Sequence, residues 1–193
     1  GPGVSSRFDA FGFRFLLLDD RMFRTPKLSA YEGKETHFGL EQEKWIFSNL
    51  KQSPSPTWLI SGDQWFGGYH RFESYEGSHP KSFKTFLASV RKARKPVVFM
   101  SGDRHLSEVM RVEKELLGFE TYEFTSSALH SKMYPSNWDT IPNKRQIMGI
   151  DLQHTFTYFD LVPPAKDLSF SLRGAAIGAG SRELYKFDLK VKR

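Results

Sequence analysis

Short apolar runs alternate with polar segments in the first half of the chain, and three of these runs end in an acidic residue. They occupy residues 13–20, 57–63 and 96–103. Near-continuous apolar runs of this length are typical of strands that are buried on both faces of a parallel sheet. Between the runs, residues 39–51 and 82–95 have apolar positions at helical spacing. The pattern therefore predicts strands that alternate with helices.

The second half of the chain is richer in β-forming residues and predicts further strands, at residues 109–112, 121–125, 148–161, 168–172 and 184–191. Residues 174–180 are rich in glycine but lack the Gly-Lys-Ser/Thr of a phosphate loop, so we expect a flexible turn there. Residues 21–38 and 64–80 are irregular and predict long loops. An α/β part thus leads into a mostly antiparallel part, which favours a layered α/β sandwich.

The acidic residues at the three strand ends are Asp20, Asp63 and Asp103. In an open α/β sheet, ligands and metals gather at the carboxyl ends of the strands. Two carboxylates about 4 Å apart repel each other by roughly 4 kcal/mol at an effective dielectric constant of about 20. Bound cations are the simplest way to stabilise such an edge, so the pattern favours a metal-dependent hydrolase.

The strongest single motif follows the third strand and reads Ser-Gly-Asp-Arg-His, from Ser101 to His105. A carboxylate and an imidazole two positions apart, on a glycine-containing turn, can face one pocket and suit Fe, Mn or Zn. The same residues are equally compatible with a turn in which Asp103 caps a helix and His105 has no metal. The spacing alone leaves both interpretations open.

Polar side chains near the other two strand ends are weaker candidates. Asp19 and Arg21 are candidate catalytic residues, and Arg21 and Arg24 candidate substrate-binding residues, because guanidinium groups hold phosphate in a bidentate fork. A surface salt bridge is the alternative. Gln64 offers a carbonyl oxygen or belongs to a turn, and Glu73 lies in a polar loop where a single glutamate is usually exposed.

Composition sets wider limits on the class of protein. The 193 residues suffice for one domain with a sizeable core, and the absence of cysteine excludes disulfides and thiolate ligands. No apolar run approaches the roughly 18 residues of a membrane helix, so we expect no membrane span. The net charge is +6, with much of the excess within residues 81–95. This cluster predicts the solvated face of a helix or, alternatively, attraction of phosphate esters or nucleic acid.

We expect most of the scattered histidines to be structural or surface residues: His37, His70, His79, His130 and His154.

Taken in order, these motifs resemble those of the PhoD-type alkaline phosphatases, within the calcineurin-like metallophosphoesterases. The family's Asp-x-Arg-x-x-Arg strand end is matched by Asp19, Arg21 and Arg24. The family's Gly-x-x-Gln-x-x-Trp helix is matched by Gly39, Gln42 and Trp45, and its strand from Trp to Gln is matched by Trp58 and Gln64. Its acidic loop of the type Asp-x-Trp-x-Gly is matched by Glu73, Tyr75 and Gly77. Its Ser/Thr-Gly-Asp-x-His motif is matched by Ser101 to His105. The resemblance covers roughly residues 10–130.

The resemblance implies a metal centre that contains Asp103, His105 and Glu73, with Gln64 as a weaker candidate ligand. It implies two or more metal ions, either Fe with Ca or a pair of Mn or Zn, and a phosphate mono- or diester as substrate. Glu73 and Tyr75 stand where the family more usually has Asp and Trp, which leaves the identity of the metals open.

The family's first half carries further metal ligands, and none of its motifs precedes Phe13. We therefore expect residues 1–193 to form the C-terminal portion of a layered α/β/β/α metallophosphoesterase-like sandwich. Residues 1–105 would be its α/β part with the site motifs, and residues 106–193 its mostly β part. The expected partner is an N-terminal half or a second polypeptide, without which the isolated chain is inactive and exposes an apolar sheet edge.

Two other interpretations remain. One is a non-catalytic basic module that binds nucleic acid or another anion, and the other is a structural half-domain that only completes a partner. The family resemblance implies a periplasmic or secreted location and leaves a cytoplasmic one open.

Overall fold

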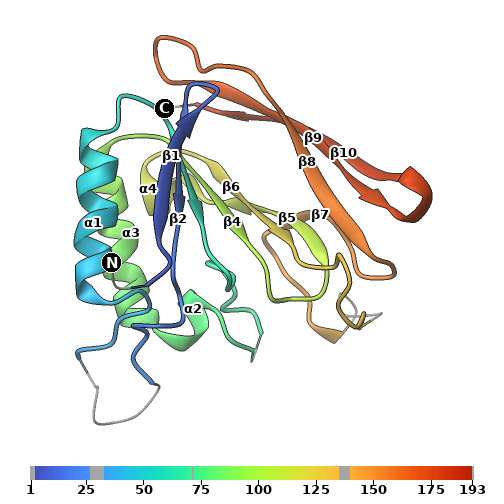
Figure 1. Cartoon of the computed structure of the whole chain (residues 1–193), viewed down its shortest axis with the longest axis horizontal. Coiled ribbons are helices and arrows are strands. Elements are labelled where there is room, and N and C mark those ends of the chain that lie inside the picture. Colours follow the sequence, from blue (N-terminus) through green and yellow to red (C-terminus); the bar gives the residue numbers. More distant parts are fainter. Residues whose placement is uncertain (1–2, 27–32, 71, 135–139, 193) are drawn as a thin grey trace.

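Two packed sheets with helices on one side make up the computed structural model, which describes residues 3–26, 33–70, 72–134 and 140–192 (Figure 1). The larger sheet has seven strands in the order β1-β2-β3-β4-β6-β5-β7. Their bounds are β1 Ser6–Ala10, β2 Phe13–Leu17, β3 Thr57–Ile60, β4 Val97–Ser101, β5 Ser107–Val112, β6 Thr121–Ser126 and β7 Gln146–Ile150. The smaller sheet has the order β10-β9-β8, with bounds β8 Thr155–Leu161, β9 Phe170–Gly178 and β10 Glu183–Val191.

The helices cover one face of the seven-stranded sheet, and the three-stranded sheet packs on the other face (Figure 1). The two longer helices are α1 Leu40–Gln52 and α3 Pro80–Ala93, and two single turns are α2 Tyr75–Ser78 and α4 Lys114–Leu117. The described residues thus form three successive layers, helices, sheet and sheet. This agrees with the predicted layered α/β sandwich.

Aromatic side chains fill both interfaces of the seven-stranded sheet. Between the two sheets, Phe124 packs edge-on against Phe159, with ring centroids 4.9 Å apart. On the helix side, the ring of Phe86 contacts Phe38 and Trp65. Because large aromatic rings bury more apolar area than most residues, the buried phenylalanines supply much of the core on both faces of the sheet.

The parallel register brings three strand ends to one edge of the sheet. Strands β2, β3, β4 and β6 run parallel, with Leu17 opposite Ile60 and Ile60 opposite Met100. The backbone N–H of Leu18 donates to the carbonyl of Ile60, and that of Gly102 to the carbonyl of Gly62. The polar residues that follow β2, β3 and β4 are therefore neighbours in space.

One strand prediction and one turn prediction are wrong in detail. Residues 148–161 do not form one strand: β7 belongs to the large sheet and β8 to the small one, and the chain crosses between them at residues 151–154. Residues 174–178 belong to β9, and only the 3₁₀ turn Ala179–Ser181 (η2) is the expected turn. Small residues occur in β9 because the ring of Phe187 and the carbonyl of Tyr158 lie against Gly174 and leave no room for a side chain.

The prediction of an exposed apolar edge beside β2 is also wrong. The sequence pattern did not reveal β1, and this strand covers the edge. β1 pairs antiparallel with β2 and forms the edge of the sheet. Its residues are exposed except for the half-buried Ala10, although the ring of Phe8 stacks on Phe15 with centroids 4.6 Å apart. The exposed edge of the sheet is thus mostly polar.

The basic cluster lies on the outer surface of α3, where Lys81, Lys84, Arg91 and Lys92 are exposed. This position fits the solvated face of a helix. In the part of the chain that the structure describes, no helix is long and apolar enough to cross a membrane.

Candidate functional site

The turn after β2 is built around the carboxylate of Asp19. This side chain accepts the backbone N–H groups of Val4, Arg21 and Met22 at 2.9 to 3.1 Å. Although burial acts to raise it, these hydrogen bonds hold the pKa of Asp19 below its ordinary value. Gln42 of α1 fixes the same point, because its amide accepts from the Asp19 N–H at 2.9 Å and donates to the Asp19 carbonyl at 2.7 Å. Asp19 and Gln42 thus hold the strand end in place.

The next residue, Asp20, binds the strand end of β3. Its Oδ2 accepts from the hydroxyl of Ser61 at 3.0 Å and from the N–H of Asp63 at 2.5 Å. A Cβ on Gly62 would lie 2.9 Å from this oxygen. The glycine of the first Ser-Gly-Asp therefore permits the close approach of two buried carboxylates.

The position of the proton on the His37 ring depends on its contact with His79. Nε2 of His79 lies 2.9 Å from the carbonyl oxygen of Thr25, which can only accept, so this nitrogen carries hydrogen. When His79 is neutral, its Nδ1 is an acceptor, and the donor is Nδ1 of His37, 3.3 Å away. In that state the free lone pair of His37 is on Nε2, a buried nitrogen that has no hydrogen-bond partner among the described residues.

The environment of His37 keeps its ring neutral. Burial, reinforced by His79 and the guanidinium groups of Arg24 and Arg21, lowers the pKa of His37 to about 2. The ring stacks on Tyr75 with centroids 4.5 Å apart, which holds its plane.

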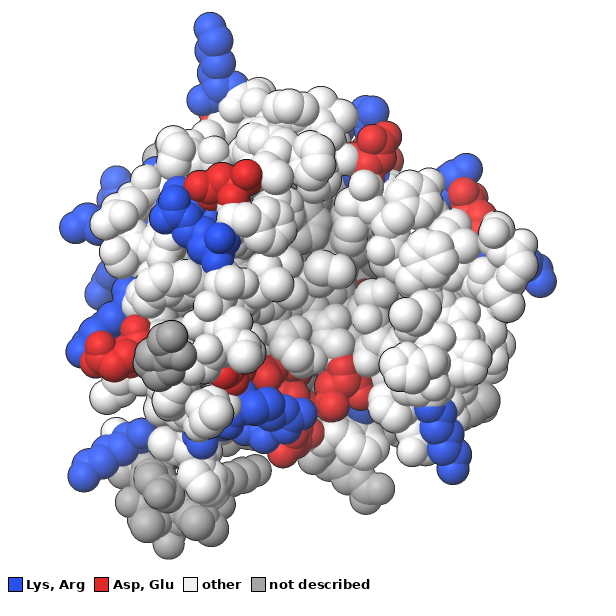
Figure 2. Space-filling view, in the orientation of Figure 1, with Lys and Arg blue, Asp and Glu red and all other residues white. Residues whose placement is uncertain are grey.

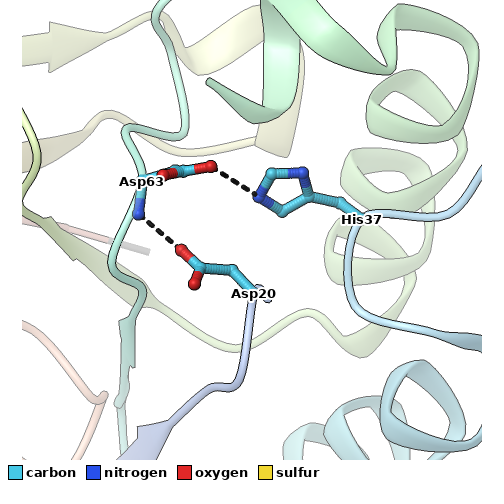
Figure 3. Close-up of side chains that lie close together, drawn as sticks. All are labelled: Asp20, His37 and Asp63. Atoms are coloured by element: carbon cyan, nitrogen blue, oxygen red, sulfur yellow. Dashed lines mark hydrogen bonds and ion pairs between the residues drawn. The ribbon is translucent and has the colours of Figure 1, made fainter. Parts of the chain in front are cut away.

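Asp20, His37 and Asp63 converge in one buried cluster (Figure 3). Among the residues that the structure describes, they are the one group of three histidine or acidic side chains whose ligand atoms all lie within 4.8 Å of one another. Nε2 of His37 lies 3.8 Å from Oδ2 of Asp63. Burial first, and then the carboxylate of Asp20, raises the pKa of Asp63 to about 6, against the opposing effect of Arg21 and Arg24.

The donor set of this cluster fits a metal ion. One imidazole nitrogen and two carboxylates suit Zn, Mn or Fe. A histidine that binds a metal usually donates its other ring N–H to a second group, and His79 is that group here. The buried Asp–His–Asp cluster could therefore hold a metal ion.

Two arginines lie beside the cluster and bridge the same pair of acids. Arg21 donates to Oδ1 of Asp63 at 3.1 Å and to Oε2 of Glu73 at 2.6 Å. Arg24 donates to Oδ2 of Asp63 at 2.6 Å and to Oε1 of Glu73 at 3.0 Å. Asp63 is fully buried, whereas the side chains of Arg21 and Glu73 are 55% and 52% exposed. Figure 2 shows acidic and basic side chains gathered at the lower edge of the molecule, where Figure 1 places the strand ends.

The Ser-Gly-Asp-Arg-His turn has an unusual backbone. Asp103 and His105 both adopt left-handed conformations, with φ of 68° and 53°. Such conformations in non-glycine residues cost free energy and are concentrated at functional sites. Oδ1 of Asp103 lies 3.8 Å from Nη2 of Arg21, and Nδ1 of His105 donates to the carbonyl of Lys132 at 2.6 Å. Asp103 thus faces the arginine pair, while His105 is held beside the turn after β6.

Gln64 lies in a separate buried network rather than in the Asp–His–Asp cluster. Its Nε2 donates to Glu108 and to Thr125, each at 2.7 Å, and its Oε1 accepts from His70 at 2.9 Å. These bonds occupy both ends of the amide.

The same network contains a second buried acid, Glu123. Its carboxylate accepts from the N–H groups of Trp65 and Phe66, each at 2.9 Å, and from the hydroxyl of Ser101 at 2.6 Å. Burial raises the pKa of Glu123 to about 7. Glu108 and Glu123 had no sequence signal, because each occupies an ordinary strand position.

The sequence-predicted residues are only partly brought together. Arg21, Arg24, Glu73 and Asp103 share one surface, whereas His105 and Gln64 have their hydrogen bonds elsewhere. Asp20 and Asp63 were noticed as strand-end acids, but nothing in the spacing linked them to His37. A histidine just before a helix, among polar residues, has no pattern that marks it as buried.

Comparison with known proteins extends this description. A family model described as PhoD-like phosphatase matches residues 10–161. A solved structure described as "Structure of PhoD" is similar to the chain with a TM-score of 0.68 at 16% sequence identity. The match covers 94% of this chain and 44% of that chain, so the chain spans less than half of that protein. A search of curated proteins found no match. Since the family model spans most of the sequence, the chain belongs to the PhoD-like phosphatase family.

Proposed function

We propose that this chain is part of a metal-dependent phosphate ester hydrolase whose site lies at the carboxyl ends of β2, β3 and β4. The observation that carries the proposal is the buried Nε2 of His37, which has no hydrogen-bond partner among the described residues and clusters with two carboxylates, next to two arginines. The first feature suits a cation and the second an oxyanion. Their juxtaposition is what hydrolysis of a phosphate mono- or diester requires.

Asp20, His37 and Asp63 would hold one metal ion. Such an ion lowers the pKa of a bound water and neutralises charge on phosphoryl oxygens. The chain's own residues prepare the position. A neutral His79 would keep the imidazole in the tautomer with its lone pair on Nε2, and Ser61 orients Asp20.

Arg21 and Arg24 would bind the phosphate group of the ester. Their guanidinium groups share two partners and are thereby held close together. Planar guanidinium forks recognise tetrahedral oxyanions with two parallel hydrogen bonds. Asp19 would act as a positioning residue, because its carboxylate is occupied by backbone N–H groups of this turn.

Asp103 and His105 would belong to the same centre as ligands of a further metal, as the family resemblance implies. Their left-handed backbone supports a functional role. The resemblance also implies Gln64 and Glu73 as ligands, but both have other partners here. The chain spans 44% of the PhoD chain that it resembles, so turnover would need the complementary part of the enzyme, on the same or a second polypeptide.

Metal binding by the chain itself tests the proposal. Titration with Zn²⁺ or Co²⁺, followed by calorimetry and by the visible spectrum of Co²⁺, should show one site. His37→Gln should weaken binding at least tenfold, because it removes the nitrogen ligand. His154→Gln is the matched control, since this histidine contacts the carbonyl of Ala128 outside the cluster. Equal affinity in wild type and His37→Gln would refute the assignment.

A further inference from the structure

The carboxylate of Glu73 already occupies the solvent-facing side of Arg21 and Arg24, the two arginines proposed to bind phosphate. Glu73 accepts one hydrogen bond from each guanidinium group, at 2.6 Å from Arg21 and at 3.0 Å from Arg24. The two oxygens of its carboxylate thus occupy the outer side of the fork, and the carboxylate of Asp63 occupies the inner side.

We propose that Glu73 is a built-in competitor for the phosphate group, which must displace Glu73 from Arg21 and Arg24 in order to bind. This inference rests on the proposed function, because it assumes that the same two arginines receive the substrate. It adds a means of regulation, since substrate binding is then coupled to release of the Glu73 side chain.

Burial decides which of the two acids gives way. The side chain of Asp63 is fully buried, and its backbone N–H is bonded to Asp20. Removing its arginine partners would leave a buried charge without compensation, which is costly. Glu73 is 52% exposed, and its carboxylate can move into water at little desolvation cost.

Charge balance leads to the same conclusion. The two guanidinium groups face the carboxylates of Asp63 and Glu73, and Arg21 also lies 3.9 Å from Asp20 and 3.8 Å from Asp103. With Glu73 in place, the fork has no net attraction for a further anion. Release of Glu73 removes one of these negative charges and frees one hydrogen-bond donor on each arginine for a phosphate group.

The segment around Glu73 allows such a movement. Glu73 lies between β3 and the single turn α2, and its neighbour Ser74 caps that turn by accepting from the N–H of Gly77. The turn itself is held by Tyr75, which is buried against His37. Glu73 can thus rotate outward while α2 stays in place.

Binding of inorganic phosphate tests the inference. The dissociation constant is measured by calorimetry or by ³¹P NMR for wild type, Glu73→Gln and the control Glu41→Gln. Both variants lose one negative charge, but Glu41 pairs with the exposed Lys44, away from the two arginines. Glu73→Gln should bind phosphate about tenfold more tightly, which corresponds to about 1.4 kcal/mol. Glu41→Gln should match wild type.

A further variant separates this inference from the proposed function. Adding Arg24→Gln to Glu73→Gln should abolish the gain. If wild type and Glu73→Gln bind phosphate equally and Arg24→Gln weakens both, the arginines bind phosphate but the competition by Glu73 is refuted. If no variant binds phosphate, the arginine site of the proposed function fails, and the inference fails with it.

Discussion

Gln42 offers the sharpest test of how the strand-end site is held in place. Its buried amide forms three hydrogen bonds to backbone groups, one with the N–H of Asp19, one with the carbonyl of Asp19 and one with the carbonyl of Phe38. Replacing it by alanine leaves these buried groups without the amide. At about 1 kcal/mol for each lost bond, Gln42→Ala should lower the free energy of unfolding by about 3 kcal/mol.

The matched control is Gln52→Ala on the same helix. Its amide makes one exposed hydrogen bond, to the hydroxyl of Ser48 at 3.1 Å. Removing an exposed side chain of this kind should change stability by no more than about 0.5 kcal/mol. The two variants therefore differ in burial and in hydrogen bonding but not in residue type.

Equilibrium unfolding in urea, followed by tryptophan fluorescence, measures both variants. For Gln42→Ala we expect a lower midpoint with an unchanged slope, because the variant should lose stability without changing the surface exposed on unfolding. Gln42→Glu should lose at least as much stability as Gln42→Ala, since a carboxylate accepts from Asp19 but cannot donate to either carbonyl. If Gln42→Ala and Gln52→Ala are equally mild, the amide does not hold the strand end, and the reasoning is wrong.

Three further predictions concern the site, the acid network and the small sheet. Arg21→Lys in the complete enzyme should weaken inhibition by inorganic phosphate, because an ammonium lacks the planar fork; unchanged inhibition constants would reduce Arg21 to a surface salt bridge. The pKa of Glu123 is about 7 in the fold and 4.5 as the reference value, so the folded state binds the extra proton and wild type loses roughly 3 kcal/mol as pH rises through this window. The free energy of unfolding of wild type, measured relative to that of the non-titrating variant Glu123→Gln, should therefore fall between pH 5 and pH 8 in urea unfolding. A rise in this difference would contradict the assigned pKa. Gly174→Ala should destabilise the fold by about 1–3 kcal/mol, because the added Cβ would clash with the carbonyl oxygen of Tyr158. An unfolding midpoint equal to that of wild type would show that β8 and β9 can separate without cost.

The sequence by itself determined the alternation of strands and helices in the first half and the polar residues at the strand ends. Apolar runs and helical spacing are local properties, so they place α1, α3, β2, β3 and β4 close to their observed bounds. The order of the motifs also led to the family, which the family model confirms for residues 10–161. Apolar runs, helical spacing and motif order all depend only on the positions of residues along the chain.

Only the tertiary structure decided which polar residues meet. The parallel register brings Asp20 against Asp63, and the packing of the segment before α1 brings His37 to them through Tyr75 and His79. β7 and β8 belong to different sheets. Alternation of polar and apolar residues predicts a strand but not the sheet that the strand joins, so the sequence did not reveal the crossing between them. Burial likewise converts ordinary strand glutamates into the Glu108 and Glu123 network, because it is the loss of water around a carboxylate that changes its chemistry.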